Sequence, residues 1–321
     1  MYASTATASV AVAALLGVGT LLMSGTTADA PGRDAASAGP AAVAHTVAAG
    51  TGVRTAGDVA RGRTGDPVVI AHRGASAYAP ENTLAAVDRA DDLGIDWVEN
   101  DVQLTRDGVL VVIHDTGLKR TTDAEEVFPG RAPWAVKDFT ASEIARLDAG
   151  SWFGPQYAGA RVPTLQQYLH RIGRNGQNLL LEIKSPETYP GIERATLRVL
   201  RQEGWLDREH VRGRLVIQSF GADSVRTVHE QRPDVITGFL GTPAVADLPS
   251  YAEFTDQINP AYTSVSGEYV AAVHALKGPH DKRLRVSTWT VNDAEHALRV
   301  AGYGVDGIIT NTPDVVREAT G

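Results

Sequence analysis

Residues 70–83 read IAHRGASAYAPENT, and this stretch decides the fold. The apolar run over 68–71 predicts a short strand that ends on His72 and Arg73. A helix is predicted to begin near the Asn-Thr pair that closes the stretch, because both residue types cap helix N-termini well. A strand that carries His and Arg at its C-terminal tip is typical of α/β barrels, which place their chemistry at that end.

The same pattern of a buried strand followed by a helix recurs along the chain, most regularly from Thr164 onward. Eight strands are predicted to end at His72, Asp101, Lys184, Ser219, Leu240, Asn259, Trp289 and Asn311. Eight strands joined by helical connections predict a closed parallel α/β barrel, the (β/α)8 TIM barrel. After the seventh strand, Asn292 is expected to be the helix N-cap, with Glu295 as its capping-box partner.

The connection after the second strand departs from this repeat. Another apolar strand over 109–113 follows a tight turn, and a parallel crossover would need about a dozen residues or more. We therefore expect an antiparallel hairpin that leaves the barrel mouth and returns His114 to the neighbourhood of Glu99 and Asp101. Residues 116–163 are expected to form a lid insertion at the mouth, where loops select substrates. An insertion without a role in the reaction is the alternative.

The chain of 321 residues divides into three parts. Residues 1–30 hold an apolar run and then an A-x-A cleavage signal, which predicts a signal peptide and a secreted, extracellular protein. The run is too short for a comfortable membrane span, so no stable membrane insertion of the mature form is expected. Residues 31–66 are rich in Ala, Gly and Thr and predict a disordered spacer. Residues 67–321 suit one TIM-barrel catalytic domain.

Composition excludes several kinds of site. The chain has no cysteine, which excludes zinc sites built on thiolates and a cysteine nucleophile. The formal net charge of −8 at pH 7 argues against nucleic acid as a partner. A phosphate-containing substrate is compatible with this charge, provided that a metal ion or local cations lie in the pocket.

In a closed barrel, the polar residues at separate strand ends meet in one pocket. The residues expected there are His72, Arg73, Glu99, Asp101, His114, Glu182, Lys184 and Trp289. Three carboxylates suit a hard divalent cation, Ca²⁺ or Mg²⁺, although a salt bridge explains Glu99 and Asp101 equally well when they are taken alone. An arginine and a lysine suit a bound anion, and two histidines can serve as base and acid. Together these groups indicate metal-assisted phosphoester cleavage.

Residues 68–315 contain an ordered set of short polar motifs. The motifs are His72-Arg73-Gly74, Pro80-Glu81-Asn82-Thr83, Glu99-x-Asp101-Val102, Thr105-x-Asp107-Gly108, His114-Asp115, Glu182-Ile183-Lys184, Ser219-Phe220, Trp289-Thr290-Val291-Asn292 and Thr310-Asn311-x-Pro313-Asp314. Their identity and order resemble those of the glycerophosphodiester phosphodiesterase family. The resemblance implies a (β/α)8 barrel that hydrolyses small-molecule glycerophosphodiesters to sn-glycerol 3-phosphate and an alcohol.

The resemblance also implies a role for each pocket residue. The implied roles are metal binding for Glu99, Asp101 and Glu182, acid–base catalysis for His72 and His114, phosphate binding for Arg73 and Lys184, and an aromatic pocket wall for Trp289. Helix capping or loop anchoring explains four further matches equally well: Glu81, Asn82, Asn292 and Asn311. We expect Ca²⁺ in preference to Mg²⁺, because secreted proteins meet abundant calcium and three carboxylates form an adaptable cage.

Two other functions are compatible with parts of the sequence. A related barrel phosphodiesterase that acts on intact phospholipids or lysophospholipids, like a phospholipase D or C, needs an apolar rim. Trp134, Trp152 and Phe153 can supply such a rim or can simply pack within the insertion. A barrel that binds glycerophosphodiesters without hydrolysing them would have a damaged set of pocket residues, and every expected residue is present here.

Overall fold

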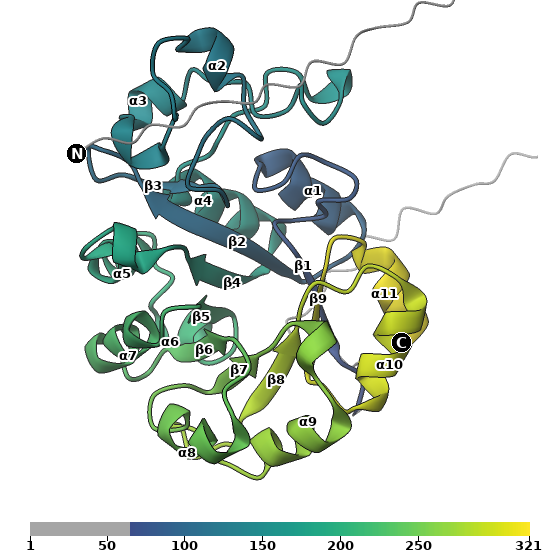
Figure 1. The fold of residues 1–321 in the computed structure, drawn as a ribbon. Helices are drawn as coiled ribbons and strands as arrows, with labels where there is room; N and C mark the ends of the chain where they lie inside the picture. Colours follow the sequence, from purple (N-terminus) through teal and green to yellow (C-terminus); the bar gives the residue numbers. More distant parts are fainter. Residues whose placement is uncertain (1–64) are drawn as a thin grey trace, which may run out of the picture. The chain divides into compact units, whose positions relative to one another are not determined.

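The computed structural model describes residues 65–321. The predicted signal peptide (1–30) and all but two residues of the predicted spacer (31–66) lie outside the described residues. The main strands, shown in Figure 1, are β1 (Val68–Ala71), β2 (Trp97–Leu104), β4 (Asn178–Ile183), β5 (Leu215–Ser219), β6 (Ile236–Leu240), β7 (Gln257–Asn259), β8 (Arg285–Thr288) and β9 (Gly307–Thr310). They pair in parallel in this order, and β1 pairs with both β2 and β9. The sheet is therefore a closed eight-stranded barrel, which confirms the predicted TIM-barrel fold.

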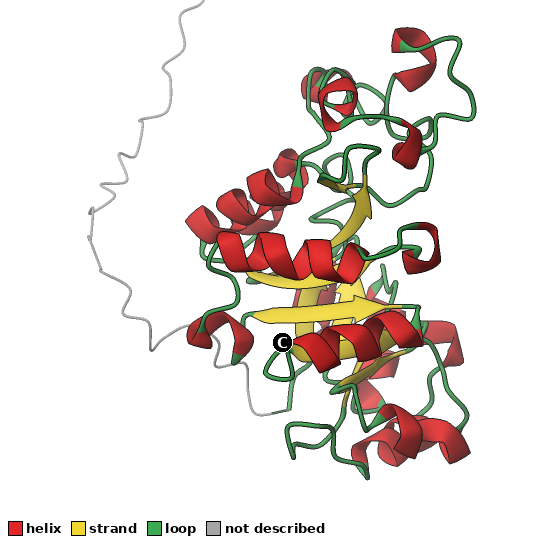
Figure 2. Cartoon of the chain, turned by 90° about the vertical axis from the view of Figure 1, so that its left-hand side faces the viewer, coloured by secondary structure: helices red, strands yellow, loops and turns green. Residues whose placement is uncertain are grey.

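Helices cover the outside of the barrel (Figure 2). They are α1 (Leu84–Asp92), α4 (Leu165–Asn175), α5 (Ile192–Gln202), α6 (Arg208–Val211), α7 (Ala222–Gln231), α8 (Leu248–Tyr251), α9 (Gly267–His274), α10 (Ala294–Gly302) and α11 (Pro313–Thr320). Short 3₁₀ turns lie at η3 (Pro186–Thr188), η4 (Val245–Asp247) and η5 (Tyr262–Ser264).

Helix α4 illustrates how the sequence sets an outer helix. Thr164 and Gln167 form a capping box at its N-terminus, and Gly176 ends it in the left-handed conformation, with φ 73°. Leu165, Tyr168, Leu169 and Ile172 recur at helical spacing and are buried. Burial of each large apolar side chain contributes roughly 1.5–3 kcal/mol, so this face fixes the helix against β2 and β4.

The barrel interior is closed below the mouth by a small apolar layer. It consists of Ile70, Leu180, Val216 and Ile309, with Trp97, Ile236 and Trp289 packed against it. Ile309 also lines the cavity at the mouth, so this layer forms the floor of that cavity. The polar side chains of Glu99, Glu182 and Gln218, on the strands above this layer, line the cavity.

The connection after β2 is an antiparallel hairpin, as its shortness led us to expect. Strand β3 (Leu110–Val112) pairs antiparallel with β2, with Val102 opposite Val112. The backbone N–H of Ile113 donates to the Asp101 carbonyl at 2.9 Å, which brings the next residue, His114, back to the barrel mouth.

The rest of the insertion, residues 116–163, lies near the tip of β2 in Figure 1. It contains α2 (Ala124–Val127), η1 (Val136–Asp138), α3 (Ala141–Ile144) and η2 (Pro155–Tyr157). It has an apolar cluster of its own, built from Val111, Ile113, Leu118, Ala124, Val136, Phe139, Ile144, Leu147, Ala149 and Val162. The insertion is therefore folded around an apolar core of its own.

One capping prediction is wrong. Helix α10 begins at Ala294, and its N-cap is Asp293, whose side chain accepts from the His296 N–H. Asn292 Oδ1 instead accepts from the Asn311 N–H at 2.8 Å, so its side chain ties the end of β9. Glu295 consequently lies in the second helical position, one residue short of the capping-box position.

Within residues 65–321, no helix has the length and apolar character needed to cross a membrane.

Candidate active site

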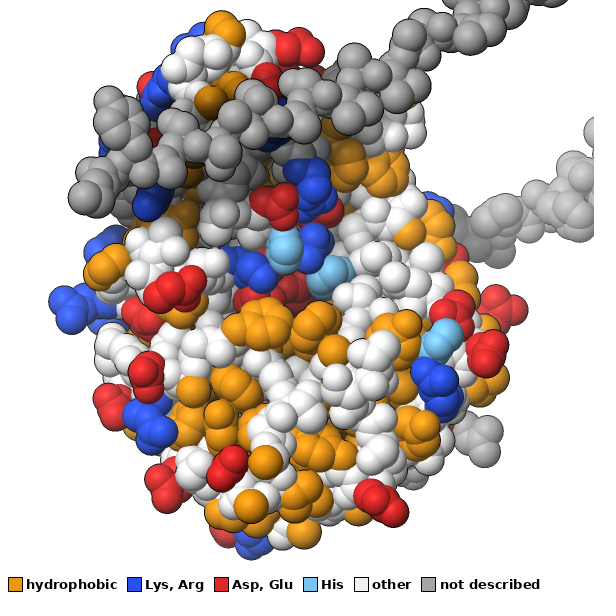
Figure 3. Space-filling view, viewed as in Figure 1, with side chains coloured by type: hydrophobic (Ala, Val, Ile, Leu, Met, Phe, Trp, Pro, Cys, Tyr) orange, Lys and Arg blue, Asp and Glu red, His pale blue; other side chains and the backbone are white. Residues whose placement is uncertain are grey.

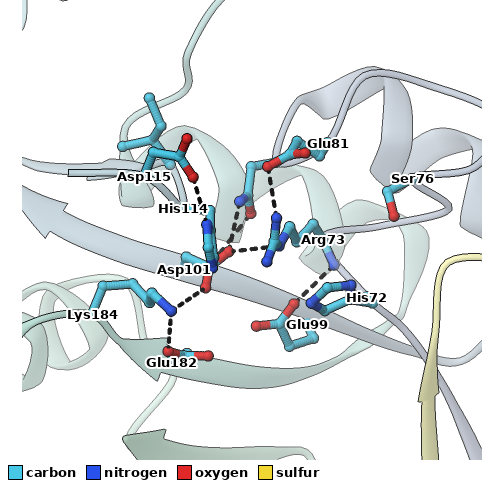
Figure 4. Close-up of polar contacts among 12 residues, drawn as sticks. His72, Arg73, Ser76, Glu81, Glu99, Asp101, His114, Asp115, Glu182 and Lys184 are labelled. Carbon is cyan, nitrogen blue, oxygen red and sulfur yellow. Dashed lines mark hydrogen bonds and ion pairs between the residues drawn. The ribbon is translucent and has the colours of Figure 1, made fainter. Parts of the chain in front are cut away.

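A cavity of about 140 Å³ opens at the carboxyl ends of the strands. Seven of the eight residues predicted for the pocket line it: His72, Arg73, Glu99, His114, Glu182, Lys184 and Trp289. The eighth, Asp101, is buried beside them, 3.3 Å from Arg73 Nε and 3.8 Å from Lys184 Nζ. The structure therefore brings all eight predicted residues together, as Figure 4 shows for the charged ones and the histidines.

Three carboxylates form an acidic triad, which consists of Glu99, Asp101 and Glu182. Asp101 and Glu182 are direct partners in the β2–β4 register, and Glu99 precedes Asp101 on the same face of β2. Each carboxylate offers one oxygen within 4.8 Å of the others, and all three side chains are buried. Burial and the neighbouring acids raise the pKa of Glu99 well above its usual value. Burial and the Asp101 charge raise the pKa of Glu182 to about 8.

Asp101 behaves differently from its two neighbours. Its burial acts to raise the pKa, but the positive charges of Arg73 and Lys184 outweigh burial and lower the pKa of Asp101. Asn82 Nδ2 also donates to Asp101 Oδ2 at 2.8 Å. Asp101 Oδ1 has no hydrogen-bond partner among residues 65–321. A buried, ionised oxygen without a hydrogen-bond donor is suited to bind a cation.

Arg73 and Lys184 lie on either side of the triad. Lys184 Nζ lies 2.7 Å from Glu182 Oε1, and Arg73 Nη1 donates to Glu81 Oε1 at 2.9 Å. The backbone N–H of Arg73 donates to Glu99 Oε2 at 2.8 Å. Both cationic side chains line the cavity and keep 16% and 13% of their surface accessible, so each can contact an anion that enters.

Each histidine of the pocket is held through its Nδ1 atom. His72 Nδ1 lies 2.6 Å from Asn311 Oδ1, and His114 Nδ1 lies 2.7 Å from Asp115 Oδ1. Burial, followed by the charge of Arg73, lowers the pKa of His72 to about 4, so this ring is neutral near pH 7. With Nδ1 engaged, the Nε2 atom of each ring is the one free to exchange a proton.

An aromatic pair forms one wall of the cavity. Trp289 Nε1 donates to the Asn259 carbonyl at 2.9 Å, which fixes the indole. The Phe220 ring meets it edge-on, with centroids 5.5 Å apart, and 49% of Phe220 is exposed. Lys184 Nζ lies 5.3 Å from the Phe220 centroid. Figure 3 shows hydrophobic side chains bordering the charged cavity at the barrel mouth.

The sequence analysis assigned no role to three neighbours of the pocket residues, although one of them, Phe220, belongs to the quoted Ser219-Phe220 motif. Gln218 and Phe220 line the cavity, and Gln218 Oε1 accepts from Asn259 Nδ2 at 2.9 Å. Arg120, in the insertion, donates to both Asp115 and Glu81. The first two follow the β5 strand pattern at its end and could have been found from it. A single arginine in a loop carries no comparable signal.

Of the aromatic residues considered as an apolar rim, Trp134 packs against the apolar cluster of the insertion, whereas Trp152 stays 42% exposed. Trp152 and Phe153 meet edge-on at 5.6 Å, and Phe153 meets Tyr157 in the same way. Trp134 Nε1 donates to the Phe128 carbonyl.

Comparisons with known proteins agree with this geometry. Residues 72–315 match the model of the glycerophosphoryl diester phosphodiesterase family. A glycerophosphodiester phosphodiesterase of Bacillus subtilis is 34% identical over 265 residues, covering 77% of this chain and 84% of that protein. One from Caldanaerobacter subterraneus is 38% identical, covering 78% and 96%.

A solved structure from Oleispira antarctica, a phosphodiesterase in complex with the product sn-glycerol 3-phosphate, is similar in fold. It has a TM-score of 0.68 and 29% identity, and the match covers 79% of this chain and 96% of that one. On the combined evidence of its barrel, its pocket and these matches, the chain belongs to the glycerophosphoryl diester phosphodiesterase family.

Proposed function

We propose that this enzyme hydrolyses glycerophosphodiesters to sn-glycerol 3-phosphate and an alcohol. The observation that carries the proposal is the cavity itself, which combines a buried acidic triad, two cations and two histidines. The similar phosphodiesterase from Oleispira antarctica was solved in complex with sn-glycerol 3-phosphate as product, which supports the proposed reaction.

The acidic triad fits a divalent cation. Its carboxylate oxygens lie within 4.8 Å of one another, thiolate ligands are absent from the sequence, and Asp101 Oδ1 lacks a donor among the described residues. We assign Glu99, Asp101 and Glu182 as the ligands. The cation would supply charge neutralisation at the phosphate. We propose Ca²⁺ in preference to Mg²⁺, because carboxylates from two flexible glutamates and one aspartate suit its variable coordination better than a strict octahedron.

The other pocket residues act on the substrate directly. Arg73 presents a planar fork and Lys184 a point charge, and both bind the phosphate oxygens. His72 and His114 divide the proton transfers. One accepts a proton from the attacking oxygen nucleophile, which is either water or a hydroxyl of the substrate that first closes a cyclic phosphate later opened by water, and the other gives a proton to the departing alcohol oxygen. Trp289 and Phe220 exclude water from one side of the cavity and pack against the carbon part of the substrate.

We also propose that the catalytic domain of residues 67–321 acts outside the cell. The support is the apolar run and the A-x-A signal within residues 1–30, followed by the Ala/Gly/Thr-rich spacer of residues 31–66. N-terminal sequencing of the protein recovered from the medium checks this proposal. A mature end near residue 31 is expected, and retention of the full chain in the cells would contradict it.

Product identification tests the proposed reaction. Purified protein with added calcium is incubated with glycerophosphocholine, and the products are followed by ³¹P NMR. The expected products are sn-glycerol 3-phosphate and choline. Release of phosphocholine and glycerol would place the cleaved bond on the other side of the phosphorus, and turnover of lysophosphatidylcholine alone would favour a lipid substrate.

A further inference from the structure

Arg120 connects the two sides of the active-site cavity. Its Nε and Nη2 atoms donate to Asp115 at 2.6 and 2.9 Å, and its Nη1 and Nη2 atoms donate to Glu81 at 2.8 Å each. Each carboxylate in turn holds a residue of the pocket. Asp115 holds the ring of His114 at 2.7 Å, and Glu81 holds the guanidinium of Arg73 at 2.9 Å.

We infer that Arg120 is a positioning residue for the proposed hydrolysis, fixing His114 through Asp115 and Arg73 through Glu81. Its catalytic consequence rests on the proposed function, whereas the orientation of His114 rests on the geometry alone.

The chemistry of the guanidinium explains why an arginine is needed. Its planar fork carries five N–H donors and can hold two carboxylates at once, whereas a lysine ammonium is a single point charge. The hydrogen bonds from Arg120 and His114 outweigh the partial burial of Asp115 and hold its pKa well below the usual value. An ionised carboxylate only accepts hydrogen bonds, so the hydrogen of neutral His114 is held on Nδ1. Nε2 is then left for the substrate.

A purely structural role is a weaker explanation of the same contacts. Arg120 has 45% of its side chain exposed, and ion pairs at such positions contribute only about 0–1 kcal/mol to stability. The insertion has its own apolar cluster, which does not include Arg120. The principal effect of this residue is therefore expected on the ring of His114 and not on the fold.

Kinetics of Arg120→Gln test the inference. We expect kcat to fall about 10–100-fold, by analogy with the loss of hydrogen-bond partners that orient metal-binding side chains. Arg120→Lys is expected to recover only part of the loss, because it cannot hold both carboxylates. The matched control is Lys119→Gln, which removes the same charge from the neighbouring residue, whose partner is the exposed Glu125. Wild-type kcat is expected for this control.

A double-mutant cycle shows whether Arg120 acts through Asp115. Arg120→Gln and Asp115→Asn should be non-additive, since each removes the same support for His114. Fully additive effects, or a kcat and pH profile of Arg120→Gln equal to the wild type, would overturn the inference. If the wild type itself does not turn over glycerophosphodiesters, the proposed function fails, and the orientation of His114 is then decided by spectroscopy.

The spectroscopic measurement needs neither substrate nor metal. In ¹⁵N spectra of the full chain, the His114 signal is assigned by its absence in His114→Gln. We expect the neutral ring to carry its hydrogen on Nδ1 in the wild type and in Lys119→Gln, and a mixture of tautomers in Arg120→Gln. An unchanged tautomer in Arg120→Gln would show that Arg120 does not position this ring.

Discussion

Replacing Glu182 by glutamine should stabilise the metal-free protein at alkaline pH. Glu182 lies on β4 opposite Asp101, and its side chain is buried in the acidic triad. Burial and the Asp101 charge raise its pKa from 4.5 to about 8. Glutamine keeps the shape of the side chain and removes its ionisation, so the variant isolates the electrostatic cost of the third carboxylate.

The sign and size of the effect follow from the shift. Because the folded-state pKa lies above the unfolded value, protonation stabilises the fold fully below about pH 4.5, and this contribution is lost as the pH rises through about 8. The loss is about 1.4 kcal/mol per pH unit near pH 6 and becomes smaller as the pH approaches 8, which gives about 2 kcal/mol in total between about pH 6 and about pH 8. The wild type should lose this stability relative to Glu182→Gln, and the pKa of about 8 already includes the attraction of the ionised Glu182 to Lys184.

Urea unfolding in the presence of a chelator measures the effect. The free energy of unfolding of wild type and Glu182→Gln is compared from about pH 6 to about pH 9. As the pH rises, the free energy of unfolding of the wild type should fall relative to that of the variant. Glu187→Gln, an exposed glutamate past the end of the same strand, is the control and should follow the wild type. Added calcium should then stabilise the wild type much more than Glu182→Gln. Parallel pH curves for wild type and Glu182→Gln would refute the reasoning about the triad.

Four further predictions concern single positions and the substrate. His72→Ala and His114→Ala should each lower kcat by about a hundredfold to ten-thousandfold without unfolding the protein, and near-normal turnover would remove that histidine from the mechanism. Asn100 is fully buried, and neither polar atom of its side chain has a partner among residues 65–321. Asn100→Val should therefore raise the free energy of unfolding by about 1–3 kcal/mol, measured with urea, and a loss of stability would show that the amide is satisfied. Gly74→Ala should lower it by more than about 1 kcal/mol, because φ is 77° and the new Cβ would lie 2.6 Å from the Ala86 carbonyl carbon; an unchanged midpoint would contradict this. We expect comparable kcat/KM values for glycerophosphocholine, glycerophosphoethanolamine and glycerophosphoglycerol, because the polar groups of the cavity bind the phosphate that all three share. A preference above roughly a hundredfold for one of them would mean that the insertion contacts and selects the alcohol.

The fold could be predicted from the sequence because its signal is local and repeated. Most strands are short apolar runs, and six of the eight predicted strand ends are polar residues, so the barrel follows from a repeated local pattern. The hairpin followed from the shortness of one connection, and its register brought His114 to Asp101. Local signals fail where two residues can do the same job. Asn292 and Asp293 are both good helix caps, and the choice between them depends on the end of β9, which only the folded chain brings near.

The candidate site could be predicted as a set of residues but not as a network. The barrel places every strand end at one mouth, so the identities of Glu99, Asp101 and Glu182 sufficed to expect a metal site. The supporting contacts depend on loop conformations that have no periodic pattern. Arg120 donates to Glu81, which is 39 positions away in the sequence, and no sequence pattern around either residue predicts this contact.

The most direct measurement of the central claim is a calcium titration of the metal-free enzyme during turnover. Protein freed of metal with a chelator is supplied with glycerophosphocholine, and release of sn-glycerol 3-phosphate is followed as calcium is added, in parallel for wild type and Glu182→Gln. We expect no turnover before calcium is added, saturation at one cation site in the wild type, and a much higher calcium requirement in the variant. Full turnover by the chelated wild type would contradict a metal-dependent reaction at the acidic triad.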